Sequence, residues 1–160
     1  MKLKNLSKEG WSGIDVQLKR RADLIPELVN TVKAYAAHER ELFEKVTELR
    51  NETLAPHTIQ EHAATAGALS RNLQKLLLIA EDYPEVKANT NFLELQKELS
   101  RVENTLQKAR RYYNGTVREL NIKIESFPSN IVAKGLGFEK RTFFSIGNEG
   151  DRNLPEINLA

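Results

Sequence analysis

The three histidines are the first residues to consider, because imidazole is the commonest metal ligand and general base in a chain that has no cysteine. His57 and His62 are five residues apart, and this spacing does not place two ligands on one face of a helix. His38 precedes Glu39, but no second histidine follows four residues later, as the zinc-binding helix of metalloproteases requires. The sequence therefore predicts no metal and no other cofactor. A metal-binding or enzymatic bundle that uses His38 and Glu39 is the alternative.

Other catalytic patterns are also missing from the sequence. It contains no glycine-rich phosphate loop and no nucleophile elbow, and the serines on predicted helices have no histidine in register. Its 24 Lys and Arg against 22 Asp and Glu leave a net charge of only +2, and the short basic clusters are interleaved with acidic residues. We therefore expect no enzymatic activity, no catalytic residues and no nucleic-acid partner.

Polar residues that fall in phase with apolar ones predict a structural polar cluster between helices. A buried charge is costly unless it is paired and hydrogen-bonded. We predict an ion pair between Glu39 and Arg110 that sets the register of two long helices, with Asp23 as a weaker acidic candidate. The competing interpretation is that these residues flank the apolar stripe and stay hydrated. The candidates for the cluster are Asp23, Glu39, Glu103, Arg110 and Asn114.

Apolar residues at intervals of three and four predict the helices that would position these groups. We expect a first helix over residues 11–54 with a kink at Pro26, a second over 58–82 and a third over 84–125. The second would begin with a capping box formed by Thr58 and Glu61. At 1.5 Å per residue, the first and third would be roughly 60–65 Å long. Short connections make successive helices antiparallel, so the first and third would run in parallel.

Residues 127–160 are predicted to form a short helix capped by Gly135 and then an irregular tail. The tail is rich in phenylalanine and is expected to cover the part of the long helices that the second helix leaves bare. The fold class predicted for a single domain over residues 1–160 is all-α. It is an antiparallel, four-helix-bundle-like arrangement of two long helices and a shorter one, with an irregular C-terminal tail. No apolar run approaches the ~20 residues needed to span a bilayer.

Several motifs, in order, resemble the LemA family over nearly the whole chain. They include Trp11-x-x-Ile14-Asp15-Val16-Gln17-Leu18-x-Arg20-Arg21-x-Asp23-Leu24-Ile25-Pro26, Ala36-x-His38-Glu39, Glu81-x-Tyr83-Pro84, Glu103-x-x-Leu106-x-x-Ala109-Arg110-x-x-Tyr113-Asn114 and Pro155-Glu156-Ile157. The resemblance implies a bacterial helical-bundle domain with no enzymatic activity established for the family as such. It also implies that a single N-terminal membrane-spanning helix precedes the domain, which lies outside the cytoplasm. That helix is missing from this sequence, so we expect the anchor to lie upstream and the chain as given to be soluble.

These observations lead to a hypothesis for function: a non-catalytic, extracytoplasmic interaction or scaffolding domain of a membrane-anchored protein, with an unknown protein partner. A soluble cytoplasmic adaptor is a further alternative. We also predict a membrane-proximal surface formed by Trp11, Lys19, Arg20 and Arg21, where an aromatic ring and basic groups could lie near lipid headgroups. Packing of Trp11 in the core is the competing interpretation of that residue.

Overall fold

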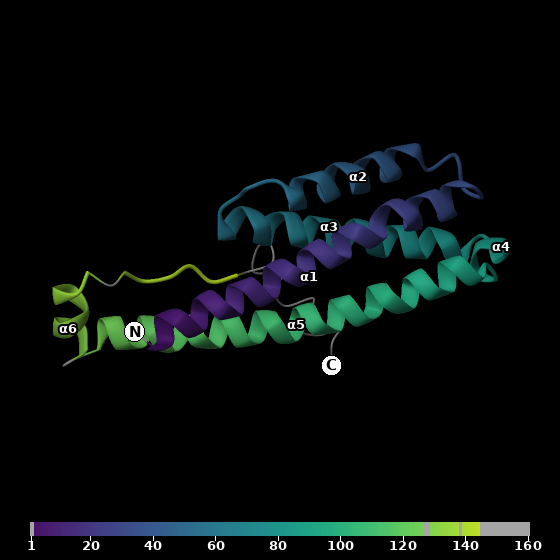
Figure 1. Ribbon diagram of the computed structural model, residues 1–160. Coiled ribbons are helices and arrows are strands. Elements are labelled where there is room, and N and C mark those ends of the chain that lie inside the picture. Colours follow the sequence, from purple (N-terminus) through teal and green to yellow (C-terminus); the bar gives the residue numbers. More distant parts are fainter. Residues whose placement is uncertain (1, 127–128, 138, 145–160) are drawn as a thin grey trace.

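Helices dominate the computed structural model, which describes residues 2–126, 129–137 and 139–144. Within these residues the chain contains no strand, and its helices are α1 (Lys2–Lys33), α2 (Arg40–Leu54), α3 (Ile59–Glu81), α4 (Pro84–Lys87), α5 (Thr90–Glu125) and α6 (Ser129–Gly135). The predicted all-α helical bundle is therefore confirmed. The long helices α1 and α5 run the length of the molecule, and α2 and α3 lie beside them along part of it (Figure 1).

The apolar stripes predicted from the sequence are the buried faces of the helices. Around α2 and α4, one large core joins apolar side chains of α1, α2, α3 and α5. A second, smaller core lies nearer the N-terminus of α1 and includes Ile14, Leu18, Ala63, Leu106 and Tyr113. Both cores form because each helix repeats its apolar residues about once per turn and so buries one continuous face.

The helix predicted over 11–54 is wrong, because the chain turns back on itself over residues 34–39. The helix ends at Lys33, Ala36 is buried in the turn, and α2 begins at Arg40. The reversal brings Phe43 and Val46 of α2 onto the same core as Val32 of α1, whereas a continuous helix would carry them away from it. Pro26 does not end α1, which continues through it.

Because of this additional turn, α1 and α5 are antiparallel rather than parallel. Asn91, near the start of α5, donates to Glu27 near the end of α1 (Nδ2 to Oε1, 3.2 Å). At the other end of the pair, Tyr113 of α5 packs on Trp11 of α1. The third predicted helix, 84–125, is also divided: α4 ends at Lys87, and α5 starts anew behind Asn89, whose side chain accepts from the Phe92 N–H (3.0 Å).

The start of the second predicted helix is confirmed in detail. The Glu61 N–H donates to Thr58 Oγ1 (3.2 Å), and the Thr58 N–H donates to Glu61 Oε1 (3.4 Å), which completes the capping box. The predicted cap at Gly135 is wrong, since Gly135 is the last residue of α6 and the left-handed residue is Gly137, with φ of 71°. The predictions for 127–128, 138 and 145–160 lie outside the described residues.

Two parts of the molecule differ in how they are covered. Trp11 packs on His62, in the first turn of α3, so the residues of α1 before Trp11 lie beyond the start of α3. We call residues 2–10 of α1 and 114–125 of α5 the extension; there the two helices continue past α2 and α3 (Figure 1). Residues 139–144, which we call the strap, return from α6 along the extension. The strap, the described part of the predicted tail, therefore covers the long helices where α3 does not, as predicted.

Helices α1 and α5 approach each other closely at Gly10. A Cβ atom at Gly10 would lie 3.1 Å from the Tyr113 Cα and 3.3 Å from the Tyr113 Cβ, whereas one at Gly13 would meet nothing within 4 Å. Alanine at either position gains about 1 kcal/mol of helix propensity, but at position 10 overpacking against the α5 backbone costs about 1–3 kcal/mol. We therefore expect Gly13→Ala to raise the free energy of unfolding by up to about 1 kcal/mol and Gly10→Ala to lower it by about 1 kcal/mol. Urea denaturation of both variants measures this difference in sign, and a stabilised Gly10→Ala would contradict the close approach.

Candidate functional site

A fully buried arginine lies where α1, α3 and α5 meet. The Nη1 group of Arg21 donates to Ser70 Oγ (2.7 Å) and to Glu103 Oε1 (2.9 Å), and its Nη2 group donates to the Ala66 carbonyl oxygen (3.1 Å). The Arg21 side chain is 0% exposed and the Glu103 side chain 32%, so the carboxylate reaches water from one side. One side chain on α1 thus connects two other helices through charge-assisted hydrogen bonds, which are the stronger kind.

The burial of Arg21 contradicts its predicted place on a membrane-proximal surface. Ile14, Leu18, Arg21, Ile25 and Leu28 follow one another at intervals of four and three, and all of them are buried. That series is a heptad pattern with an arginine at one core position. The sequence therefore did contain a signal for a buried charge on α1, but it required a polar residue to be read as part of the stripe.

The predicted ion pair between Glu39 and Arg110 does not form. Glu39 immediately precedes α2, in the turn after α1, where Tyr35 accepts a hydrogen bond from Asn89 at the start of α5. Arg110 lies about 30 Å farther along α5, at 1.5 Å per residue. The reason is the reversal over residues 34–39, which places Glu39 at the far end of the bundle. Of the predicted cluster, Asp23 is exposed, and Glu103 pairs with Arg21 instead.

Five rings gather where the extension meets α3. Trp11 lies 5.6 Å from His62, 6.1 Å from Tyr113 and 5.9 Å from Phe144, measured between ring centroids, and all three pairs are tilted. His57 meets His62 edge to face at 5.5 Å. These are favourable geometries for aromatic pairs. The core interpretation of Trp11 is therefore the one that the structure bears out.

The strap is held by side chains of α5 that bond to its backbone. The Asn121 amide donates to the Arg141 carbonyl oxygen (3.1 Å) and accepts from the Arg141 N–H (2.9 Å). The Asn114 amide makes the same two bonds to Phe144, at 3.0 and 2.9 Å. Asn114 was predicted to belong to a cluster with Arg110 and Glu39, but its amide is used on the strap.

The remaining predicted surface residues stay in solvent. Lys19 pairs with Asp15 one turn earlier (3.0 Å) and is more than half exposed, and Arg20 is exposed. A pair of this kind contributes little to stability, about 0.3–0.5 kcal/mol. Arg21 is fully buried and the partly buried Trp11 packs against the smaller core, so the four residues do not form one continuous surface.

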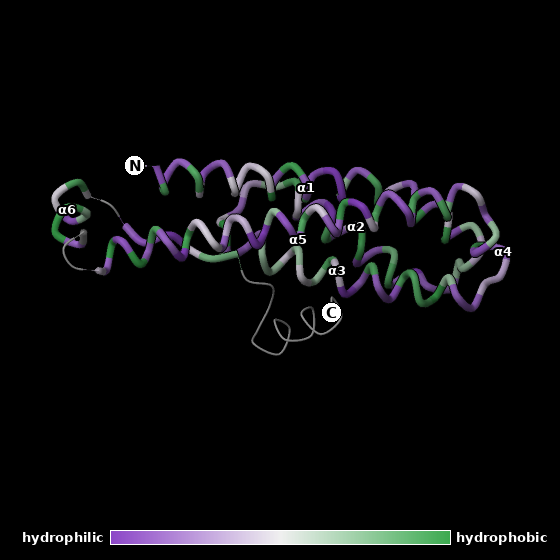
Figure 2. The backbone as a smooth tube through the Cα atoms, turned by 90° about the horizontal axis from the view of Figure 1, so that it is seen from below, coloured by the Kyte–Doolittle hydropathy of each residue, from purple (hydrophilic) through white to green (hydrophobic). Residues whose placement is uncertain are grey.

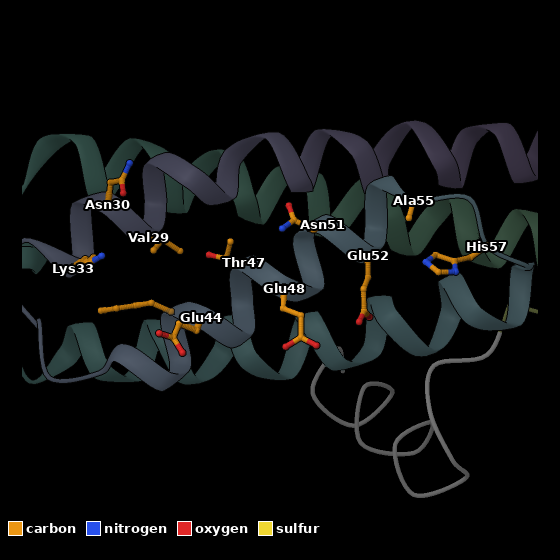
Figure 3. A pocket seen from close by; sticks show the side chains of 11 residues that line it. Val29, Asn30, Lys33, Glu44, Thr47, Glu48, Asn51, Glu52, Ala55 and His57 are labelled. Carbon is orange, nitrogen blue, oxygen red and sulfur yellow. The ribbon is translucent and has the colours of Figure 1, made fainter.

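A shallow groove runs between α1 and α2 (Figure 3). Glu44 and Glu48 lie on its α2 side, and both already have partners on their own helix, Arg40 at 3.0 Å and Lys45 at 3.7 Å. The carboxylates of Glu44 and Glu48 are therefore already engaged within α2. Its lining residues are Val29, Asn30, Lys33, Phe43, Glu44, Thr47, Glu48, Asn51, Glu52, Ala55 and His57.

Neither a metal cluster nor a membrane-spanning helix is found in the part of the chain that the structure describes. No group of three or more histidine and acidic side chains there could hold a metal ion. His38 is exposed in the turn before α2, so the alternative built on His38 and Glu39 has no third ligand among these residues. None of the described helices is long and apolar enough to cross a membrane.

Burial lowers the pKa of His62, and the nearby His57 lowers it further, whereas the carboxylates of Asp15 and Glu61 oppose the shift. Lys19 acts in the same direction as His57. With a lowered pKa, His62 binds a proton less tightly in the folded protein than in the unfolded chain. Protonation therefore favours the unfolded chain, and stability is lost as the pH falls from about 6.5 through the lowered pKa. We expect the melting temperature to drop over this range, and to drop less in His62→Leu.

The matched control for this pH dependence is His38→Leu, at an exposed position. We expect its melting temperature to fall with pH as steeply as in the parent. Thermal unfolding followed by circular dichroism between pH 7.5 and 5 measures both variants. Equal slopes for the parent and His62→Leu would show that His62 does not couple folding to pH.

The fold and site together define an elongated all-α bundle that has a buried arginine at its centre and is closed over two of its helices by its own strap. The chain belongs to the LemA family, whose family model matches residues 10–159.

Curated relatives at low identity include magnetosome proteins. "Magnetosome protein MamQ 1" and "Magnetosome protein MamQ 2" of Paramagnetospirillum magneticum are each 22% identical to the chain over 166 residues, which is 88% of this chain and 61% of the relative. "Magnetosome protein MamQ" of Magnetospirillum gryphiswaldense is 21% identical over 174 residues, 91% of this chain and 64% of the relative. The chain thus spans less than two thirds of the length of these relatives.

Proposed function

We propose that this chain is a non-catalytic interaction or scaffolding domain that acts outside the cytoplasm as part of a membrane-anchored protein. One observation carries the proposal: the Arg21, Asn114 and Asn121 side chains are used to join segments of the fold, although the Arg21 Nε and His62 Nδ1 atoms are buried without a hydrogen-bond partner among the described residues. The Arg21 guanidinium bonds to three groups of α3 and α5, and the Asn114 and Asn121 amides bond to the strap. An elongated bundle whose polar side chains join its own segments in this way is suited to presenting surfaces rather than to turning over a substrate.

Family membership supports the anchoring part of the proposal, because LemA-like proteins generally carry the bundle behind a spanning helix. The relatives are named as magnetosome proteins, so sequences similar to this chain occur in proteins that are named after a cellular structure. A domain of this kind would bring a protein partner to the membrane surface. The alternative is an adaptor that acts in the cytoplasm.

The location is tested with the complete natural gene, fused at its 3′ end to alkaline phosphatase or to green fluorescent protein. Alkaline phosphatase folds only outside the cytoplasm of a bacterium, whereas the fluorescent protein exported by the general secretion route does not fluoresce. We expect an active phosphatase fusion and a dark fluorescent fusion. A bright fluorescent fusion with inactive phosphatase would overturn the extracytoplasmic location and favour the adaptor.

The interaction role is tested by photo-crosslinking in the living cell. Leu78 on α3 is 68% exposed, so a photoreactive residue at position 78 can reach neighbouring proteins. The substitution leaves the fold intact, because it does not touch the buried groups that join the helices, such as Arg21. We expect a discrete cross-linked product that contains a second protein and is lost when expression of that protein is abolished. Only unreacted protein, at this and at other exposed positions such as Leu93, would contradict an interaction domain.

A further inference from the structure

We propose that the site on α1 and α5 that holds the strap is a binding site for an extended peptide, and that it accepts residues 139–144 of a second copy of this chain. This goes beyond the proposed function and does not depend on it. The occupant is identified by the structure itself, because the same segment is already seated there within one chain.

The site recognises backbone rather than side chains at two points. Asn121 and Asn114 each donate to a carbonyl oxygen and accept from the N–H of the same strap residue, Arg141 and Phe144 respectively. This is the pair of bonds that a residue makes with a neighbouring strand in an antiparallel sheet. The Tyr113 hydroxyl adds a third contact by donating to the Thr142 carbonyl oxygen (2.8 Å).

The spacing of the two amides matches an extended chain. Asn114 and Asn121 are seven positions apart, which on a helix is about 10.5 Å at 1.5 Å per residue. Arg141 and Phe144 are three positions apart, which in an extended segment is about 10 Å at roughly 3.3 Å per residue. The two distances agree, so the two amides of α5 can reach two residues of an extended segment that are three positions apart. Peptides that add a strand to a sheet edge are bound by the same backbone contacts.

Selectivity for this segment comes from an aromatic anchor and a charge. Phe144 is 1% exposed and contacts the Trp11 ring, whereas the neighbouring Phe143 is 41% exposed, as expected for side chains that alternate along an extended chain. Lys140 forms an ion pair with Glu125 at the end of α5. The ligand class is therefore an extended segment with an aromatic residue at the Phe144 position and a basic one four residues before it.

Helix α6, which precedes the strap, buries few apolar side chains against the rest of the bundle. Helix α6 lies at the end of the molecule, beside the end of α5 (Figure 1; Figure 2). Ala133 is its buried apolar residue, while Ile131, Val132 and Leu136 are each more than 60% exposed. Every strap contact described above is made to α1 or α5, so a strap from another copy would make the same contacts.

The balance between the two arrangements is set by concentration. A tethered strap has an effective concentration in the millimolar range, so a single chain keeps its own strap in dilute solution. Exchange is favoured when many copies are crowded together or when one copy cannot seat its own strap. This predicts that a chain whose strap cannot be seated and a chain whose strap-binding site is damaged form a heterodimer, in which the intact strap of one occupies the intact site of the other.

The experiment mixes two variants of the full chain. The acceptor carries Phe144→Ala, which removes the anchor of its own strap and leaves the site intact. The donor carries Asn114→Ala and Asn121→Ala, which remove the backbone contacts, and Trp11→Phe, so that Trp11 of the acceptor is the only tryptophan in the mixture. We expect a heterodimer by light scattering and a saturable change in tryptophan fluorescence. Neither should appear in either variant alone or with a donor that also carries Phe144→Ala.

Folding is verified by far-ultraviolet circular dichroism, and Phe144→Leu serves as the acceptor if Phe144→Ala is not helical. A capped synthetic peptide with the sequence of residues 139–144 is titrated into the acceptor as a second measurement. We expect it to bind at least tenfold more tightly than the same peptide with Phe144→Ala. Absence of binding by the peptide would overturn the peptide site. Binding of the peptide without a heterodimer at hundreds of micromolar would overturn exchange between copies.

Discussion

Arg21→Ala is expected to lower the free energy of unfolding by roughly 3 kcal/mol. The substitution removes hydrogen bonds to Ser70, Ala66 and Glu103 and leaves the space of a long side chain empty at the centre of the bundle. Glu103 loses its partner but remains accessible to water, so the cost of leaving it unpaired is smaller than the cost for a fully buried carboxylate. Urea denaturation followed by circular dichroism measures the loss.

Arg20→Ala is the matched control, because it removes the same charge from the adjacent, exposed position. We expect it to change stability by no more than about 0.5 kcal/mol. Arg21→Met separates the two causes, since methionine replaces much of the apolar stem but none of the hydrogen bonds. A loss below 1 kcal/mol for Arg21→Ala, similar to that of Arg20→Ala, would contradict the connecting role of the buried guanidinium.

Tyr113→Ala is expected to destabilise the protein by about 3–5 kcal/mol, the usual cost of removing a large buried aromatic side chain. Tyr113 is 0% exposed, and its ring packs on the ring of Trp11. It also lies against Gly10, where α1 comes closest to α5, and its hydroxyl donates to the backbone of the strap. Its loss therefore opens a cavity at the point where three segments of the chain meet. The same substitution is expected to change the fluorescence of Trp11, which reports on this contact directly.

Two controls divide this effect. Tyr113→Phe keeps the ring and removes only the hydrogen bond to Thr142, so we expect a loss of about 0.5–1.5 kcal/mol. Tyr112→Ala removes the same type of ring from the neighbouring position, which is 48% exposed, and should cost no more than about 1 kcal/mol. If Tyr112→Ala were as costly as Tyr113→Ala, the cavity explanation would fail.

Local patterns in the sequence were sufficient for much of the fold. The capping box at Thr58 and Glu61 depends on residues three apart, and the apolar stripes depend on residues three and four apart. Such short-range signals act within a single helix and do not require knowledge of its neighbours. The cover provided by the tail was also predictable, because a long apolar face that no helix covers must be covered by another part of the chain.

The reversal over residues 34–39 could not be predicted from the same patterns. Ala36 is buried within the turn and keeps the apolar phase, so two helices folded back on each other and one long helix show the same spacing. Pro26 was the more conspicuous signal for a break, yet it lies within α1 at an exposed position. Which alternative forms depends on burial against distant helices, and this information is not local.

The candidate site was predictable only in part, for the same reason. Glu103 and Asn114 lie on the predicted face of α5, but their partners follow from the direction of α1 relative to α5. Because the reversal over residues 34–39 was missed, Arg110 was predicted to be the paired cation, whereas the structure places Arg21 there. The heptad series through Arg21 was a signal for the buried cation, but the neighbouring Ala22 offers an apolar residue for the same stripe, and choosing Arg21 over it is easier once the topology is known.

The antiparallel pairing of α1 with α5 also has a consequence for how the chain is made. Arg21 and Glu103 are 82 positions apart, and Gly10, early in α1, lies against Tyr113 in the second half of α5. During synthesis from the N-terminus, α2 and α3 can pair as soon as their short connection has left the ribosome, whereas the extension must wait for the last long helix. We therefore expect the apolar residues of α1 that α5 covers to stay exposed until α5 has been made, so that chains that stop before it should be more prone to aggregate.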